Sequence, residues 1–450
     1  MEKRSVAFMT LGCKVNQYET SAMENDFINN GFEIKQFDEK ADIYIINTCT
    51  VTNVADRKSR QMIRRAKNKN KAALVVACGC YAQVSPDKLR NDIPELDLIL
   101  GINEKNNIVD IVKSKLDKSL KYSADTIISD VLHHSKYEEF QNNALIEKSR
   151  AYIKVQDGCD RFCSYCEIPF ARGKVRSRSI KNTISEVKNI AKKGIKEVIV
   201  TGIHIASYGK DFCKNVEEFE NSNGKYLIEL LKDINDVDGI ERIRISSIEP
   251  KIVTKEFLDE LIKIPKICDH FHLSLQSGSE EVLKRMNRRY TAEEFYESVK
   301  LLRNYYKNVS ITTDVIVGFP GETEQEFNEC KEFVKKCNLY FMHVFEYSQR
   351  DGTKAAVMPN QINPEIKKKR SDILINLSKE MKEEINNGYL EKEISVLFEE
   401  IDKGYLKGHT TNYILVYVKA EDGYDKYINY IVNVKLNKIY EDGIEGEIII

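Results

Sequence analysis

The sequence contains no long run of apolar residues. Its first residues, MEKRSVAFMTLGCK, hold only the short stretch VAFMT, which is too short for the core of a signal peptide. No segment approaches the roughly 20 apolar residues that a membrane-spanning helix needs. We therefore expect a cytoplasmic protein without a membrane segment.

Strong net charge and tryptophan are also missing. The 69 basic and 70 acidic side chains nearly cancel, leaving a formal net charge of −1. Proteins that bind nucleic acids are often strongly basic, so the total argues mildly against that class, although the charge is unevenly distributed along the chain. The absence of Trp beside abundant Lys, Asn and Ile is attributed to genome composition. No repeat of the solenoid type is present.

A chain of 450 residues is too long for one compact core, so two or three domains are expected. In the first 115 residues, buried strands are predicted at 5–9, 42–47 and 72–77, with helices at 16–30 and 54–69 between them. This alternation predicts an open parallel α/β sheet. Residues 117–148 lack a strong period and are predicted to be a linker or a long surface crossing.

A second series of strands follows the linker. Six strands are predicted at 151–155, 197–201, 243–246, 272–275, 312–317 and 340–345, with helices such as 180–193, 291–306 and 323–336 between them. Six successive βα units favour a barrel or partial barrel, with an open doubly wound sheet as the alternative. A long charged helix is predicted over 364–387. The tail from about residue 393 is β-rich, in the stretches SVLFEE, YILVYVKA, YIVNVKL and GEIII, which predicts a small antiparallel β module.

Eleven cysteines occur in a chain without a secretion signal. A reducing cytosol disfavours disulfides, so metal binding or redox chemistry is the better default. Four of them lie in no recognisable ligand pattern and are expected to be ordinary buried thiols: Cys213, Cys268, Cys330 and Cys337.

Three cysteines lie close together in the segment CDRFCSYC. Cys159, Cys163 and Cys166 have the spacing C-x3-C-x2-C, directly after a predicted strand. A zinc site and an ordinary iron–sulfur cluster each take four protein ligands. Three cysteines therefore suggest a [4Fe–4S] cluster with one open iron, at which the amine and carboxylate of methionine in S-adenosylmethionine (SAM) can bind. The less favoured alternative is three buried or zinc-bound thiols.

A second set of cysteines is spread along the N-terminal region. Cys13, Cys49 and Cys80 each follow the carboxyl end of a predicted parallel strand, and those ends share one edge of a sheet. Gly12 and Gly79 precede two of them and allow tight turns. The alternative is that all three are small core residues. Cys78 also lies near this edge, but we prefer Cys80 as the ligand and expect Cys78 to pack in the core.

With both triads in view, the chain resembles the methylthiotransferases of the radical SAM class along essentially its whole length. The resemblance rests on TLGCKVNQYE, NTCTVTNVADRKSRQ, GCYAQ, VQDGCDRFCSYCEIPFARGKVRSRS, TGIHIASYG, SSIEP, LSLQSGS, LKRMNRRYT, DVIVGFPGET and GHTTNYI. It implies two [4Fe–4S] clusters, an auxiliary one on Cys13, Cys49 and Cys80 and a SAM-binding one on the later triad. No catalytic residue beyond the cluster ligands is singled out.

The resemblance also implies three domains and a linker. These are an N-terminal domain with the auxiliary cluster (1–116), the linker (117–148), a radical SAM core (149–379) and a C-terminal RNA-binding antiparallel β-barrel called TRAM (380–450). The sequences of these motifs most resemble those of the family branch that methylthiolates C2 of N6-threonylcarbamoyladenosine at tRNA position 37. The alternatives are isopentenyl-adenosine in tRNA, an aspartate of a ribosomal protein, or a metal-containing RNA-binding protein without catalysis. An electron donor and a sulfur source are required and are not identified.

Strand ends of the predicted barrel supply candidates for SAM binding, because such barrels bind ligands at that face. The candidates are Tyr165, Gly202, His204, Ser246, Glu249, Gln276 with Ser277, and Gly318. A plug over the cluster is the alternative for Tyr165, and capping or loop roles are the alternatives for the others. Thr323, after the turn of residues 318–322, is expected to cap a helix.

Three basic groups are candidates for contacts with tRNA phosphates around the anticodon stem-loop. They are Arg57, Lys58, Arg60, Arg64 and Arg65; Arg172, Lys174, Arg176 and Arg178; and Lys284, Arg285, Arg288 and Arg289. A solvated helix face is the alternative for the first group. Tyr413, Tyr417 and Tyr427 of the tail are expected either to stack on single-stranded RNA or to pack in the core. Residues 211–224 are expected to be a surface insertion.

Overall fold

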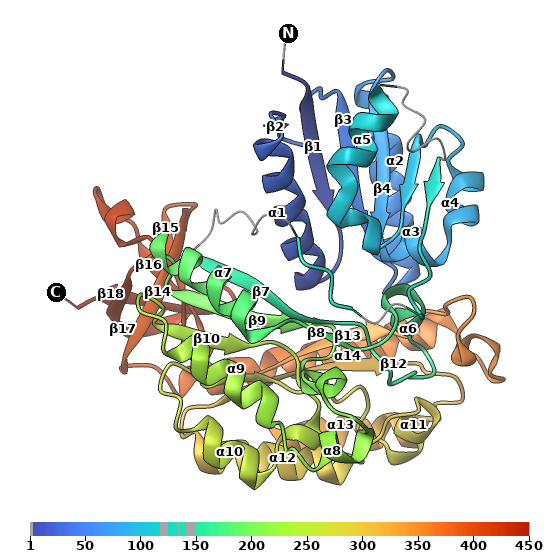
Figure 1. The fold of residues 1–450 in the computed structure, drawn as a ribbon. Coiled ribbons are helices and arrows are strands. Elements are labelled where there is room, and N and C mark those ends of the chain that lie inside the picture. The colour runs from blue at the N-terminus through green and yellow to red at the C-terminus, as the bar shows by residue number, and fades with distance from the viewer. Residues whose placement is uncertain (1–2, 118–124, 134–135, 141–148, 450) are drawn as a thin grey trace. The chain divides into compact units, whose positions relative to one another are not determined.

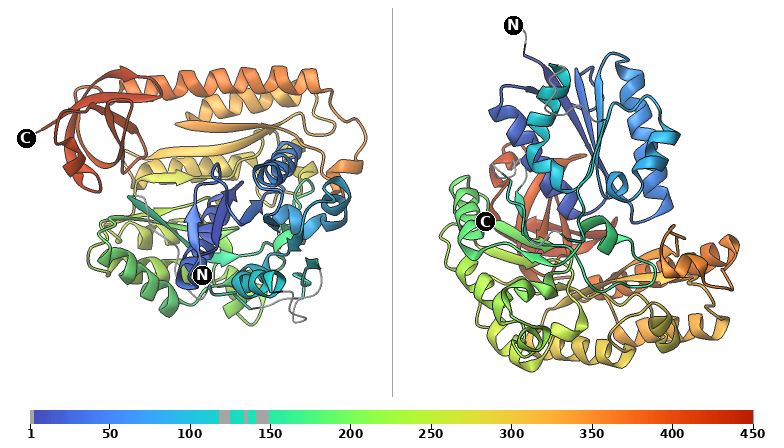
Figure 2. Two further views of the ribbon diagram at one scale, coloured as in Figure 1. Left: turned by 90° about the horizontal axis from the view of Figure 1, so that it is seen from above. Right: turned by 45° about the vertical axis from the view of Figure 1, so that its right-hand side comes forward.

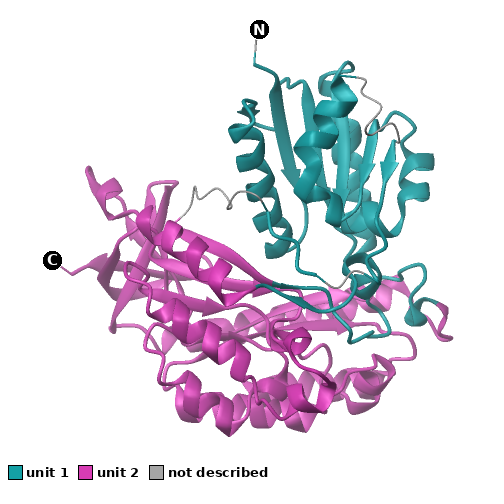
Figure 3. Ribbon diagram, in the orientation of Figure 1, with its two compact units in different colours: residues 1–146, 156–178, 348–356 teal, residues 147–155, 179–347, 357–450 magenta. Residues whose placement is uncertain are grey.

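The computed structural model describes residues 3–117, 125–133, 136–140 and 149–449. The chain forms two compact units (Figure 3), and each contains segments that are distant in sequence. The first unit comprises residues 1–146, 156–178 and 348–356. The second comprises residues 147–155, 179–347 and 357–450.

A six-stranded sheet organises the first unit. Its order is β2-β1-β3-β4-β5-β6 and every pair is parallel, as expected for an α/β sheet (Figure 1). The strands are β1 Ser5–Thr10, β2 Glu33–Lys35, β3 Ile43–Thr48, β4 Leu74–Gly79, β5 Leu98–Leu100 and β6 Thr126–Ile127. The three strands predicted at 5–9, 42–47 and 72–77 are thus present as β1, β3 and β4.

Helices cover both faces of this sheet, because its strands are apolar on both sides. Val6 and Phe8 pack with Phe27 on the face covered by α1 (Lys14–Asn29) and α5 (Ile108–Leu116). Ala7 packs with Met62 on the face covered by α2 (Asn53–Lys69), α3 (Cys80–Val84) and α4 (Pro86–Asp92). This alternation is the period of two that a strand imposes on its side chains.

The predicted linker over 117–148 contributes an edge strand to this sheet. β6 pairs with β5, and Val131 is buried a few residues later. Residues 118–124, 134–135 and 141–148 of the predicted linker lie outside the described residues. The unit is completed by the short helix α6 (Ile168–Arg172), by β8 (Arg176–Ser177) and by residues 348–356.

Two sheets form a partial barrel, one with the order β10-β9-β7-β8 and the other with the order β11-β12-β13. Their strands belong to the second unit, except for β8 and the last two residues of β7, which belong to the first unit. Single parallel bridges, Ile243 to Ile267 and Ile248 to Leu273, connect the strand series between the sheets. The strands are β7 Arg150–Asp157, β9 Glu197–Gly202, β10 Arg242–Ile245, β11 His270–His272, β12 Ser310–Val317 and β13 Phe341–Glu346.

Helices connect these strands, as expected for successive βα units. They are α7 Ile180–Lys192, α8 Val216–Glu220, α9 Lys225–Asn235, α10 Lys255–Leu261, α11 Glu280–Arg285, α12 Ala292–Tyr305, α13 Glu324–Cys337 and α14 Pro364–Asn387. The long helix predicted at 364–387 is confirmed as α14. The segment 211–224, which holds α8, is largely exposed, as predicted for a surface insertion.

A closed five-stranded barrel follows α14 (Figure 2). Its order is β14-β15-β16-β18-β17, and its strands are β14 Glu393–Asp402, β15 Tyr405–Thr410, β16 Leu415–Lys419, β17 Ile431–Tyr440 and β18 Gly443–Ile448. The sequence analysis did not identify β15. The barrel differs from a wholly antiparallel one because β16 and β18, which close it, are parallel.

The helices of the described residues include none long and apolar enough to cross a membrane. The predicted fold class, an α/β protein with a partial barrel and a C-terminal β-barrel, is confirmed. The division at residues 116, 148 and 379 remains a prediction.

A candidate metal centre with two cysteine triads

Three neighbouring strands of the first unit place Cys13, Cys49 and Cys80 at one edge of the sheet. β1, β3 and β4 are adjacent and parallel. Cys13 caps α1 after β1, Cys49 directly follows β3, and Cys80 begins α3 directly after β4. Strands that run in the same direction end at the same edge, so the three cysteines come together although 67 positions separate the first from the last.

Backbone geometry around these residues explains the glycines before two of them. Gly12 and Gly79 have φ of 95° and 100°, in the region that favours glycine. A Cβ added to Gly12 would lie 2.6 Å from Cys49 Sγ. The turn at Gly12 and Cys13 therefore passes directly over the Cys49 thiol. A tight turn was predicted at Gly12.

Electrostatics also indicate that the three thiols are close neighbours. Burial, together with the nearby thiols of Cys80 and Cys13, raises the pKa of Cys49 to about 12. Burial likewise raises the pKa of Cys80, with a smaller raising effect from Cys13, whereas Arg172 and Lys105 lower it. Metal binding requires thiolates, so cations beside this triad favour the form that binds metal.

Cys78 has a different environment from Cys80. It lies inside β4, is fully buried, and packs in the core beneath α1 and α5. Cys80 packs instead with Ile102 and Ala171, at the end of the strand. These positions agree with the expected packing role for Cys78.

A buried network of charges lies behind the first triad, and the sequence analysis did not identify it. Fully buried Arg172 donates hydrogen bonds to Glu19 (2.8 Å) and Asn16 (2.8 Å) of α1 and to Asp157 (3.1 Å). Lys105 donates to Glu19 as well (2.6 Å). Glu19 and Asn16 lie on the helix that Cys13 caps, and Asp157 lies two residues before Cys159. The network thus joins the backbone around the two triads.

The second triad lies in the loop between β7 and α6, within the same unit. Its three cysteines are all partly exposed. The Cys166 amide donates to the Cys163 carbonyl (3.0 Å), and the Cys159 amide donates to the Gly173 carbonyl (3.0 Å). Gly158 begins the loop with φ of 74°, and a Cβ there would lie 1.8 Å from the carbonyl oxygen of Lys174. Glycine is therefore required where the chain enters the cysteine loop.

Each triad offers three thiols, and all eleven cysteines are thiols rather than disulfides. Within the described part of the chain, no three His, Cys, Asp or Glu side chains are grouped tightly enough to hold one metal ion. The thiols of an iron–sulfur cluster bind different irons, so such ligands are spread more widely than those of one ion. Three thiols at one edge, with cations beside them, fit a cluster with one iron left open.

Two candidates for SAM binding meet in the second unit. The Nε2 atom of His204, two residues beyond β9, lies 3.1 Å from a carboxylate oxygen of Glu249 beyond β10, and its Nδ1 atom contacts the Ser207 hydroxyl (2.6 Å). Arg288, which was expected to meet phosphate, donates instead to the other Glu249 oxygen (3.2 Å). Glu249 is buried.

The other candidates in the second unit lie at further strand ends. Gly202 is the last residue of β9, and Ser246 directly follows β10 with a buried hydroxyl that lacks a hydrogen-bond partner among the described residues. Gln276 has φ of 71° and pairs with Val315 of β12, while Ser277 is fully buried.

Gly318 directly follows β12, and the turn after it is firmly anchored. Its amide donates to Glu322 (2.6 Å), which Arg370 of α14 also contacts (2.7 Å). Thr323 caps α13 in a capping box with Glu326, as predicted. Tyr165, the remaining candidate, is partly exposed in the cysteine loop of the first unit.

The prediction that the second basic group meets phosphate is wrong for three of its four members. Arg172, Arg176 and Arg178 are 0%, 1% and 4% exposed, and only Lys174 is exposed. The arginines pair with acids inside the first unit, Arg172 and Arg176 with Asp157 and Arg178 with Glu139. In the third group, Arg285 binds Glu326 (2.9 Å) and Arg288 binds Glu249, whereas Lys284 and Arg289 are exposed.

The first basic group remains accessible on α2. Arg57, Lys58, Arg64 and Arg65 are exposed there. In the tail, Tyr417 is buried (3% exposed), so packing is its role. Tyr413 stacks on His270 and His409 and lies beneath Arg244, whereas Tyr427 is half-buried.

Three of the four cysteines expected to be buried are buried: Cys268, Cys330 and Cys337. Cys213 is the exception. It is partly exposed beside the Tyr226 hydroxyl (3.4 Å), because it lies in the surface insertion.

Comparison with known proteins defines the class first. Residues 153–334 match the radical SAM superfamily, and residues 5–101 match a family described as "Uncharacterized protein family UPF0004". The solved structure of the radical S-adenosylmethionine methyltransferase TsrM from Kitasatospora setae is similar in fold, with a TM-score of 0.55 at 14% identity over 79% of this chain and 75% of that one. Residues 153–334, which include the second cysteine triad, therefore belong to a radical SAM enzyme.

Curated relatives define the family within that class. The chain is 38% identical to the threonylcarbamoyladenosine tRNA methylthiotransferase MtaB of Bacillus subtilis, over 99% of this chain and 96% of the relative. It is 41% identical to the MtaB of Aquifex aeolicus, over 87% of this chain and 92% of the relative. Methylthiotransferases named for other substrates match at lower identity, at 32% for a tRNA-2-methylthio-N(6)-dimethylallyladenosine synthase and 34% for a ribosomal protein uS12 methylthiotransferase. The chain belongs to the radical SAM methylthiotransferase family.

Proposed function

We propose that this protein transfers a methylthio group to C2 of N6-threonylcarbamoyladenosine at position 37 of tRNA. The observation that carries the proposal is the higher identity, 38–41%, to relatives named for this substrate than to those named for dimethylallyladenosine or uS12, at 32% and 34%. The motifs TLGCKVNQYE, DRKSRQ and MNRRYT point to the same branch.

The two triads are assigned to two [4Fe–4S] clusters, the auxiliary one on Cys13, Cys49 and Cys80 and the SAM-binding one on Cys159, Cys163 and Cys166. When bound, the clusters and SAM supply the radical, the sulfur and the methyl group. Arg172 and Lys105 favour the Cys80 thiolate and offset the negative charge of a thiolate-bound cluster. The buried network around Glu19 keeps the Cys13 helix in place beside them.

The remaining candidates are assigned by position. Gly202, His204, Ser246, Glu249, Gln276 and Gly318 follow or end strands of the partial barrel and are proposed to bind SAM. Tyr165, beside Cys166, is proposed as a separate candidate for a SAM contact. The exposed bases of α2 and the C-terminal barrel are proposed to hold the anticodon stem-loop. We propose a cytoplasmic location, where tRNA is available, together with a separate electron donor and sulfur source.

Nucleoside analysis of tRNA tests the substrate. Digested tRNA from a deletion strain is expected to contain N6-threonylcarbamoyladenosine without its 2-methylthio form, and the wild-type gene is expected to restore that form. A C159A/C163A/C166A gene is the matched control and should not restore it. Persistence of the 2-methylthio nucleoside in the deletion strain would contradict the assignment, and loss of the methylthio group from dimethylallyladenosine or uS12 would redirect it.

Anaerobic reconstitution tests the cofactors separately. The wild-type chain is expected to bind about eight irons and the triple variant about four, since each cluster contains four. Wild-type protein with reductant is expected to cleave SAM, and the triple variant is not. Binding of zinc in place of iron, with no SAM cleavage, would support a non-catalytic metal protein instead.

A further inference from the structure

A buried arginine far along the chain lies at the centre of a second network in the first unit. Arg350 is only 4% exposed. It donates to Glu167 from Nε (3.0 Å) and Nη2 (2.8 Å), and to Asn53 from Nη1 (2.7 Å). Nη2 also lies 2.5 Å from the Thr50 hydroxyl and 2.8 Å from an Asp56 oxygen. All of its donor nitrogens are therefore engaged.

Two of these partners adjoin the cysteine triads. Thr50 follows Cys49 directly, and Glu167 follows Cys166 directly. The Thr50 hydroxyl also donates to Glu167 (2.6 Å). The segment that carries Arg350 makes another contact with the second triad, since the Ala355 amide donates to the carbonyl of Ser164 (2.8 Å). One arginine thus connects the segment that follows Cys49 of the first triad with the segment that follows Cys166 of the second triad.

Charge balance makes this contact dependent on the arginine. Asp56 and Glu167 are both buried, at 5% and 8% exposure, and Arg350 is the cation that bonds to both. Without it the two carboxylates would face each other in a poorly hydrated space, and like charges there repel. The planar guanidinium satisfies several acceptors at fixed angles, which an ammonium group does not.

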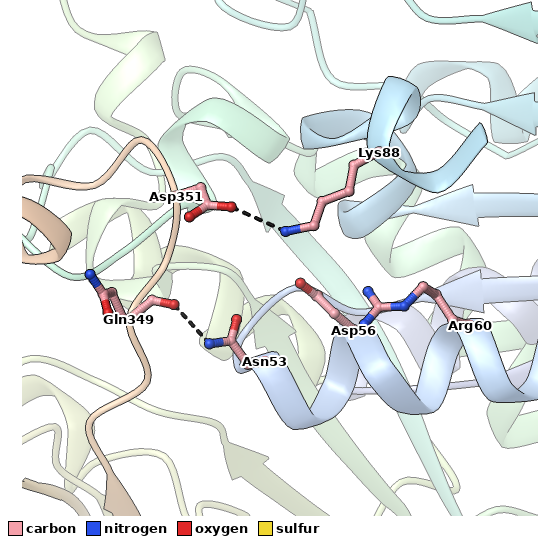
Figure 4. Close-up of a pocket in the computed structure, with 6 residues that line it drawn as sticks. All are labelled: Asn53, Asp56, Arg60, Lys88, Gln349 and Asp351. Carbon is pink, nitrogen blue, oxygen red and sulfur yellow. Dashed lines mark hydrogen bonds and ion pairs between the residues drawn. The ribbon is translucent and has the colours of Figure 1, made fainter. Parts of the chain in front are cut away.

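A polar cavity on the other side of Asp56 gives that carboxylate somewhere to move (Figure 4). It measures about 280 Å³ and is lined by Asn53, Asp56, Arg60, Lys88, Gln349 and Asp351. The second Asp56 oxygen is buried and has no hydrogen-bond partner among the described residues. If Arg350 were lost, Asp56 would turn toward the cavity and water would enter beside the Cys49 loop.

We propose that Arg350 is a positioning residue that sets the distance between the two cysteine triads. The inference rests on the proposed function in one respect, namely that each triad holds a cluster. Sulfur insertion requires the radical and the sulfur to reach the same carbon, and an error of about 1 Å in such geometry can reduce a rate by about 100-fold. Arg350 would therefore matter for the transfer to tRNA more than for SAM cleavage alone.

The experiment compares R350Q and R350K with K88Q. Lys88 is a matched control because it lines the same cavity but is about half exposed (53%) and pairs with Asp351 (3.1 Å) rather than with Thr50, Asp56 or Glu167. Each protein is reconstituted anaerobically and its iron is counted. Electron paramagnetic resonance of the reduced clusters then reports the magnetic interaction between them, which depends on their separation. The last measurement is the ratio of methylthio nucleoside to 5′-deoxyadenosine.

R350Q is expected to keep its iron and to cleave SAM, but with an altered magnetic interaction. Its product ratio is expected to fall by at least about tenfold, with R350K intermediate and K88Q like the wild type. If R350Q does not load iron, R350K decides the outcome. A wild-type magnetic interaction and product ratio in every iron-loaded Arg350 variant would overturn the proposal. The magnetic measurement needs no tRNA, so a wrong substrate assignment would leave it interpretable.

Discussion

The burial of Arg172 leads to a prediction that separates two roles for the basic segment after the cysteine loop. The sequence suggested that Arg172 binds tRNA phosphates, whereas the structure buries it fully among Glu19, Asn16 and Asp157. Substitution R172Q removes the cation and leaves two buried carboxylates with reduced compensation. We expect the apo-protein to lose stability, and we expect no direct effect on the salt dependence of tRNA binding.

The size of the loss follows from the contacts that remain. Removing one partner of a buried ion pair costs about 3–5 kcal/mol, because the other charge stays buried. In R172Q, Glu19 would still be paired with Lys105 (2.6 Å), and Asp157 would still be paired with Arg176 (3.5 Å). The lower end of the range therefore applies, and R172Q should destabilise the first unit by about 3 kcal/mol, or roughly 100-fold in its unfolding equilibrium.

Hydrogen–deuterium exchange of the reduced apo-protein measures the loss of stability separately in each unit. A global unfolding curve of a chain with two units does not separate them. Peptides from β1, β3 and β4 should exchange roughly 100-fold faster in R172Q, while peptides from the C-terminal barrel stay unchanged. R178Q is a matched control, since its partner Glu139 is one-third exposed (33%) and the pair is worth about 1 kcal/mol or less. Exposed K174Q should change neither set of peptides.

A result in which R172Q exchanges like the wild type would refute the reasoning. So would a drop in tRNA affinity with a reduced salt slope in a fully stable R172Q protein, because that is the signature of a lost phosphate contact.

Three other predictions follow from single positions. G158A forces a Cβ to 1.8 Å from a backbone carbonyl at φ of 74°, so iron bound by the second triad should fall in reconstitution while the first triad keeps about four irons. Y417A should destabilise the C-terminal barrel by about 3 kcal/mol in hydrogen exchange, because the ring is buried, whereas Y430A, at 60% exposure, should leave it unchanged. Burial lowers the pKa of His409 below its usual 6.5, so the folded barrel binds fewer protons than the unfolded chain; its stability should fall as pH drops below about 6.5, and H409N should weaken that dependence.

Much of the first unit was predictable because its strands are buried on both faces. Continuous apolar runs at 5–9, 42–47 and 72–77 have no other simple explanation, and the rule that parallel strands end together predicted where Cys13, Cys49 and Cys80 meet. The barrel strand β15 was missed because its sequence, YLKGHT, alternates Lys, Gly and His with few apolar residues. The parallel closure of β16 and β18 depends on pairing between residues 28 positions apart, such as Val416 and Ile444, which a local pattern does not report.

The buried arginines were not predictable from local sequence. A run such as Arg172 to Arg178 looks like a solvated surface, and the acids that neutralise it lie elsewhere in the chain. Glu19 is 153 positions from Arg172, and Glu167 is 183 from Arg350. One cue was available in the sequence. These basic residues lie within a few positions of the expected cluster ligands, where a buried cation offsets the negative charge of the thiolates. That cue does not distinguish a phosphate contact from a structural one.

The first unit draws on three separated stretches of chain, and this has a consequence for synthesis on the ribosome. Its last stretch, residues 348–356, emerges about 180 residues after Glu167, a delay of roughly 10–40 s at usual elongation rates. During that interval both cysteine loops exist, but Asp56 and Glu167 lack their shared cation. A nascent chain would thus hold its thiols without the contacts of Arg350 until residues 348–356 emerge. Iron–sulfur assembly factors would therefore meet a more open site during synthesis than after release.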